Sequence, residues 1–156
     1  MTLIAIGVDQ STTKTGLCMR RFTLNGHSKV IRAATINTPT YIDMRNAITG
    51  FIALHSPTVI MCEDGFKGCN VMTTVTAAWV EAIVCQYKLG EMFDKVSASE
   101  WRKAVWGKMK SLNSAEWKAY SIAQAIKAGI VDPDDHQGDA DGICQYAIKM
   151  YTEGSR

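Results

Sequence analysis

Two short apolar runs that each end in an acid constrain the fold of this chain more than any other feature. Residues 3–8 read LIAIGV and lead into Asp9, while residues 58–62 read TVIMC and lead into Glu63. A run that is apolar on both alternating faces is typical of a strand buried inside a sheet that helices cover. Because sites in such sheets form at the carboxyl ends of strands, we expect Asp9 and Glu63 to meet if these two strands are neighbours.

The remaining pattern alternates strands and helices. Residues 15–19, a stretch from Phe22 and residues 29–36 surround Asn25-Gly26, a pair that favours a hairpin turn, and indicate antiparallel strands. The pattern therefore predicts an α/β fold with a five-stranded mixed sheet and helices on both faces. The other expected elements are helices at 42–54 and 70–89, a strand at 93–96, a helix capped by Ser99 and ended by Gly107, a helix capped by Ser114 and ended by Gly129, and a last helix from Asp134 or Asp135.

Length and composition favour a single globular domain over residues 1–156. The chain is 47% hydrophobic, yet no window approaches the roughly 18 unbroken apolar residues that a membrane span needs. The N-terminal apolar run lacks the basic start of a signal peptide, so we expect a cytoplasmic protein. Five scattered cysteines, an odd number without CxxC spacing, indicate neither a disulfide framework nor a zinc site.

The strand-end acids have two possible readings. Asp9 precedes Gln10-Ser11-Thr12 and can simply cap the next turn. Two acids at the ends of neighbouring strands, however, repel one another and need a cation to be stable together. The second reading predicts a metal site.

The segment PDDHQGDADG supplies further ligands if it is helical. His136 and Asp139 lie three residues apart and Asp135 and Asp139 four apart, so all three share one helix face. A solvated acidic first turn, favoured by the helix dipole, is the alternative for Asp132, Asp134 and Asp135. The small residues Gly138, Ala140 and Gly142 would let this turn approach other backbone closely.

Oxygen-rich ligands with one imidazole suit Mg²⁺, with Mn²⁺ as a substitute. Two such ions can promote in-line displacement at a phosphodiester, so the expected chemistry is nuclease chemistry. His136 could serve as a metal ligand or as a proton acceptor for the attacking water, and both roles stay open.

Basic residues gather in one stretch, although the whole chain carries only +2. Residues 101–118 hold five basic residues and one acid, with Trp101, Trp106 and Trp117 among them. A basic rim beside an acidic site suits contacts to DNA phosphates, whereas a solvated face is the alternative for any single lysine. We expect the three tryptophans to be core anchors rather than base-stacking platforms. The predicted rim comprises Lys67, Arg102, Lys103, Lys108, Lys110 and Lys118, with Lys14 as a further member.

Several segments together resemble the RuvC-type Holliday junction resolvases, which have a ribonuclease H-like fold, and in particular their small bacteriophage members. The matching segments are IGVDQSTTKTGLCM, IMCEDGFKGCN, WRKAVWGKMKSLNSAEWKA and HQGDADGICQYAI. The strongest elements are the strand-end Asp9, the spacing of Glu63, Phe66 and Asn70, and the HxxDA that begins at His136. Gln10 stands where many members have proline, and Trp117 where many have a basic residue.

The resemblance implies a structure-selective endodeoxyribonuclease that resolves four-way junctions by paired nicks, using two Mg²⁺ ions per site. It implies that the catalytic and metal-binding residues are Asp9, Glu63, His136 and Asp139. It also implies that Phe66 lies near the junction crossover, that Arg102 lies near the scissile strand, and that a homodimer forms through the helix from Asn70. A phage member would act in the cytoplasm of its host cell.

Other functions remain to be distinguished. The first motif also resembles the phosphate-binding turn of sugar kinases, but the chain lacks their second glycine-rich loop and the length of their two lobes. A ribonuclease H-like nuclease acting on RNA/DNA hybrids or forks would share the metal chemistry. A non-catalytic junction-binding module would need the basic rim without the acids.

Overall fold

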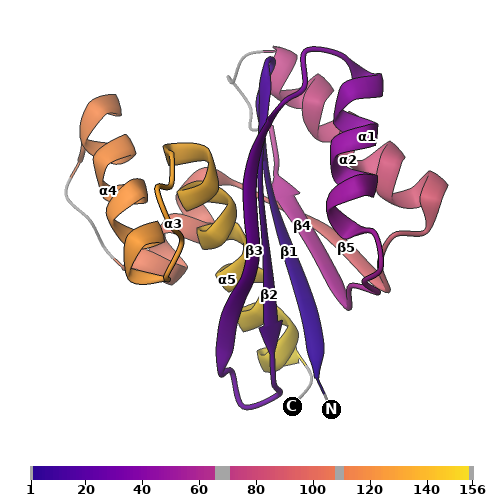
Figure 1. Cartoon of the computed structure of the whole chain (residues 1–156). Helices are drawn as coiled ribbons and strands as arrows, with labels where there is room; N and C mark the ends of the chain where they lie inside the picture. The colour runs from indigo at the N-terminus through magenta and orange to yellow at the C-terminus, as the bar shows by residue number, and fades with distance from the viewer. Residues whose placement is uncertain (1, 66–70, 108–110, 155–156) are drawn as a thin grey trace.

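The computed structural model describes residues 2–65, 71–107 and 111–154, which form a five-stranded sheet with helices on both faces (Figure 1). The strand order is β3-β2-β1-β4-β5. β1 pairs antiparallel with β2 and parallel with β4, so the predicted mixed sheet is confirmed. The strands are β1 (Leu3–Gln10), β2 (Lys14–Phe22), β3 (Ser28–Asn37), β4 (Val59–Glu63) and β5 (Met92–Val96).

The central position of β1 explains why its sequence is apolar on both faces. Leu3 and Ala5 pack into the core on one face of the sheet, whereas Ile6 and Val8 pack into the core on the other. Each face is closed by helices, so a polar residue on either side of β1 would be buried without water.

Helices cover the sheet unequally (Figure 1). One face carries α1 and α2, and the other carries α5, against which α3 and α4 pack. Among the described residues, none of these helices combines the length and apolarity needed to cross a membrane. The helices are α1 (Tyr41–Ile52), α2 (Val71–Tyr87), α3 (Ala98–Trp106), α4 (Ser114–Lys127) and α5 (Asp135–Gly154).

Two predicted helix caps are wrong by one or two residues. Ser97, not Ser99, caps α3 by accepting a hydrogen bond from the Glu100 backbone N–H. Asn113, not Ser114, caps α4 and forms a reciprocal capping box with Glu116. An N-cap must face the N–H groups two or three residues ahead, and Ser99 and Ser114 already lie inside the first turn.

β2 is also longer than predicted, because Phe22 ends this strand instead of starting another. Arg20 and Arg21 interrupt the apolar pattern, and the pairing register of β2 with β3 shifts between Met19 and Arg20. Arg20 is nevertheless buried. Its Nε and Nη2 donate to the two carboxylate oxygens of Asp141 in α5, at 2.6 and 3.0 Å, so the charge enters the core with its counter-ion.

α5 lies unusually close to its neighbours. A Cβ atom added to Gly7 in β1 would lie 2.0 Å from the Ala140 carbonyl oxygen. On the helix itself, a Cβ on Gly138 would lie 2.3 Å from Ser121 Oγ, and one on Gly142 would lie 2.2 Å from the Trp101 ring. The predicted close approach to backbone is confirmed at Gly138, where a Cβ would lie 2.4 Å from the Ser121 carbonyl oxygen, whereas at Gly142 the close neighbour is a side chain.

We therefore predict that Gly7→Ala lowers the free energy of unfolding by about 3 kcal/mol, because backbone must move to admit one methyl group. Gly50→Ala is the matched control, since a Cβ there meets nothing within 4 Å. It should leave stability unchanged or raise it by up to about 1 kcal/mol, as expected inside a helix. Urea unfolding measures both, and a Gly7→Ala protein as stable as the wild type would contradict the packing described.

Candidate active site

The predicted site residues meet at one edge of the sheet. Asp9 is near the carboxyl end of β1, and Glu63 ends β4, the parallel neighbour of β1. Gly16, the partner of Asp9 in β2, lies against the start of α5, where a Cβ would be 2.2 Å from the His136 carbonyl oxygen. This contact brings the first turn of α5 over the strand ends.

Asp9 and His136 are in direct contact. His136 Nδ1 and Asp9 Oδ2 lie 2.7 Å apart, and both side chains are largely buried. The hydrogen bond to Asp9 raises the pKa of His136 above its ordinary value, although burial acts in the opposite direction. The bond orients the ring and leaves Nε2 as the second nitrogen available for chemistry.

Glu63 is held by donors from two other elements. Trp101 Nε1, from α3, donates to Glu63 Oε2 at 3.1 Å, and Gln10 Nε2 donates to the Glu63 backbone carbonyl. Burial, followed by repulsion from Asp9, raises the pKa of Glu63 to about 7. The Trp101 hydrogen bond and the charge of Arg102 only partly offset this rise.

Asp139 is clamped between α3 and α4. Arg102 Nη2 donates to Asp139 Oδ2 at 2.9 Å, and Ser121 Oγ donates to Asp139 Oδ1 at 2.7 Å. Burial and then repulsion from Asp9 raise the pKa of Asp139 to about 6, against the lowering effects of Arg102 and Ser121. Asp9 therefore disfavours the ionised form of both Glu63 and Asp139.

The donor chemistry fits a hard divalent cation, because three carboxyl groups and one imidazole converge. The raised pKa values of Glu63 and Asp139 reflect negative charge that a cation would neutralise. In the described part of the chain, however, no three His, Cys, Asp or Glu side chains are already arranged as a ligand set. Each acid instead bonds a protein group, although every carboxylate keeps further lone pairs that a metal could use.

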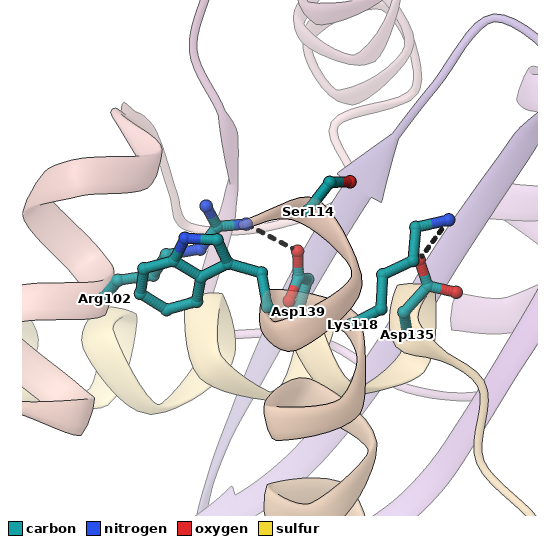
Figure 2. A pocket seen from close by; sticks show the side chains of 6 residues that line it. Arg102, Ser114, Lys118, Asp135 and Asp139 are labelled. Carbon is teal, nitrogen blue, oxygen red and sulfur yellow. Dashed lines mark hydrogen bonds and ion pairs between the residues drawn. The ribbon is translucent and has the colours of Figure 1, made fainter. Parts of the chain in front are cut away.

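A pocket of about 410 Å³ opens beside Asp139 (Figure 2). Two ion pairs lie along it: Arg102 with Asp139 at 2.9 Å, and Lys118 with Asp135 at 3.3 Å. Ser114 and Trp117 complete its lining. Asp135 thus faces Lys118 in this pocket, whereas His136 contacts Asp9.

Four of the eight predicted DNA-binding residues lie in the described part of the chain. Arg102 and Lys118 line the pocket, Lys103 is exposed on α3, and Lys14 is exposed at the start of β2. The other four lie outside the described residues; they are Phe66, Lys67, Lys108 and Lys110.

Three side chains that donate hydrogen bonds to Asp139 or Glu63 could not be recognised as such from the sequence. Ser121 lies mid-helix and belongs to no motif, so nothing in its neighbourhood marked it. Trp101 was correctly predicted as a core anchor and is fully buried, but its N–H also needs an acceptor, which Glu63 supplies. Gln10 drew notice only as a departure from proline, and it ties β1 to β4.

Comparisons with known proteins support the fold. No protein-family model matches the sequence, and no curated protein matches it. Among solved structures, Thermus thermophilus RuvC in complex with a Holliday junction substrate superposes with a TM-score of 0.75 at 12% identity, covering 98% of this chain and 97% of that one. The Fowlpox virus resolvase with Holliday junction DNA gives 0.60 at 11% identity, covering 98% and 99%.

A third match is the yeast mitochondrial Holliday junction resolvase, with a TM-score of 0.56 at 11% identity, covering 96% of this chain and 83% of that one. The matches span 96–98% of this chain and 83–99% of the solved structures, so the likeness concerns the complete sheet and its helices. This chain therefore has the fold of the RuvC-type resolvases, and the predicted ribonuclease H-like fold is confirmed. At these identities the likeness establishes the fold alone.

The raised pKa values predict how stability depends on pH without metal. A carboxyl group whose pKa is higher in the folded state costs stability as pH rises from its unfolded pKa to its folded one. Glu63 and Asp139 define a window from about pH 4 to pH 7, and the raised pKa of His136 acts in the same direction. We expect the free energy of unfolding in EDTA to fall by about 2 kcal/mol between pH 5 and 7.5.

Glu63→Gln should flatten this decline, whereas Glu91→Gln, which changes an exposed acid, should retain the wild-type slope. Urea unfolding at a series of pH values measures both. Equal slopes in the wild type and Glu63→Gln would show that Glu63 does not carry the charge penalty.

Proposed function

We propose that this protein is a divalent-metal-dependent endodeoxyribonuclease that resolves four-way DNA junctions by paired nicks. The convergence of Asp9, Glu63 and Asp139 with His136, from three separate segments, is the observation that carries the proposal. Glu63 and Asp139 are buried together at an energetic cost, because the pKa of each stays raised although Trp101 bonds the first and Arg102 and Ser121 bond the second. Such costs are typical of functional sites.

In the proposed mechanism, Asp9, Glu63, Asp139 and His136 would hold Mg²⁺, with two ions per site and Mn²⁺ as a substitute. When bound, the metal would supply Lewis-acid chemistry for phosphodiester hydrolysis. Asp9 fixes the His136 ring through Nδ1, which leaves Nε2 to accept a proton or bind metal. Trp101 and Ser121 orient the carboxyl groups of Glu63 and Asp139.

The substrate proposal rests on the surface around the acids. The pocket beside Asp139 carries Arg102 and Lys118, whose charges suit a phosphodiester backbone. We propose that the remaining contacts come from Lys14, Phe66, Lys67, Lys103, Lys108 and Lys110. The junction DNA in the Thermus and Fowlpox structures supports a branched substrate for this fold.

Paired nicks require two active sites, so we propose a homodimer that forms through α2. This helix contains one charged residue, Glu81, and leaves apolar side chains uncovered. Val71 is 74% exposed, Met72 40% and Tyr87 42%. We also propose that residues 1–156 act as one nuclease domain in the cytoplasm; the free thiols of Cys18, Cys62, Cys85 and Cys144 suit a reducing compartment.

Asp139→Asn should retain junction binding and lose cleavage by at least about 10³-fold, because it removes a proposed ligand with almost no change in shape. Asp132→Asn is the control, since it makes the same change at an exposed acid in the same segment. Gel-shift binding in Ca²⁺ and cleavage of labelled four-way junctions in Mg²⁺ give the two readouts. Full cleavage by Asp139→Asn would overturn the assignment, and cleavage of RNA/DNA hybrids in preference to junctions would favour a different substrate.

A further inference from the structure

Arg102 is held in place by more than its ion pair. Its guanidinium carbon lies 4.7 Å from the centroid of the Trp117 ring and 5.1 Å from that of the Trp101 ring. Trp106 packs against both rings, edge-on to Trp101 and stacked with Trp117. Aromatic faces attract a guanidinium and limit its motion, so the rings direct Arg102 towards Asp139.

The pairing of Arg102 is nevertheless incomplete. Its Nε is buried and has no hydrogen-bond partner among the described residues. Arg20 provides the contrast, because its Nε and Nη2 both donate to Asp141 in a closed, two-point pair. A buried unsatisfied donor costs about 1–3 kcal/mol. Arg102 therefore has donor capacity that Asp139 alone does not use.

The adjoining pocket is bounded by two cations, and each is paired with a carboxylate. Arg102 pairs with Asp139, and Lys118 pairs with Asp135 (Figure 2). A metal ion entering the site competes with Arg102 for Asp139, because both bind the same carboxylate. A phosphate entering the pocket competes with the carboxylates for the cations. Metal binding therefore frees Arg102 for a phosphate, and phosphate binding frees the carboxylates for a metal.

We propose that Arg102 is an internal counter-ion of Asp139. A divalent metal displaces Arg102 from Asp139, and Arg102 then pairs with a DNA phosphate in the adjoining pocket. This inference rests on the proposed nuclease function. Arg102 is thus a positioning residue that couples two binding events. By thermodynamic reciprocity, metal raises the affinity for DNA by the factor by which DNA raises the affinity for metal.

The test is calorimetric titration of Mn²⁺ into the protein without DNA. Arg102→Gln removes the competitor for Asp139 and should raise Mn²⁺ affinity at least threefold. Lys118→Gln removes the same charge from the same pocket, but its partner is Asp135, so the change should stay below twofold. A residue that only supported the fold would lower metal affinity when replaced, so the direction of the change separates the two roles.

Unchanged or weaker Mn²⁺ binding by Arg102→Gln, or an equal gain in Lys118→Gln, would overturn this inference alone. If the wild type bound no Mn²⁺, the proposed function would fail with it. Trp117→Leu is a second variant, which removes one ring from Arg102 and should raise Mn²⁺ affinity by a smaller factor. If Arg102→Gln does not fold, Trp117→Leu tests the same point. An unchanged Mn²⁺ affinity of Trp117→Leu would then contradict the proposal.

The coupling between metal binding and DNA binding can be measured separately. Junction affinity in Ca²⁺ divided by that in EDTA should be at least threefold larger for the wild type than for Arg102→Gln. Equal ratios would mean that Arg102 does not link metal binding to phosphate binding.

Discussion

The contact of α5 with β1 and β2 is the interaction on which the site depends. At Gly7 and Gly16 the helix approaches so closely that neither strand has room for a side chain. The buried pair of Arg20 with Asp141 fixes the same helix to β2 further along. Because Asp9 lies in β1, this packing places the first turn of α5, with His136 and Asp139, over the strand ends. A helix seated further away would separate His136 from Asp9.

The acids repel one another in this arrangement, and the neighbouring groups compensate for the repulsion only in part. Asp9 disfavours ionisation of both Glu63 and Asp139, while His136, Trp101, Ser121 and Arg102 supply compensating hydrogen bonds or charge. These partners come from three helices. Although the acids lie near one another, no three His, Cys, Asp or Glu side chains of the described residues form a ready ligand set. Burying Glu63 and Asp139 together costs stability, as is common at functional sites.

The sequence predicted the features that depend on local patterns, but not those that depend on contacts between distant positions. Apolar runs predicted β1 and β4, because strand periodicity is a local property. The acids at the ends of these runs predicted that Asp9 and Glu63 belong to the site. The resemblance to resolvases identified His136, whose contact with Asp9 spans 127 positions. The partners Ser121, Trp101 and Arg102 lie 18, 38 and 37 positions from the acids they bond, and no spacing rule connects them. The caps at Ser97 and Asn113 were missed because several adjacent polar residues can satisfy the same rule.

We propose that Asp9, Glu63 and Asp139 form the active site of a junction-resolving nuclease. The decisive measurement is to map the nicks on all four strands of an immobile four-way junction in Mg²⁺. We expect symmetric nicks in two opposed strands, with linear duplex of the same sequence left uncut. Nicks in only one strand, equal cutting of duplex, or no cutting in Mg²⁺ or Mn²⁺ would overturn this assignment.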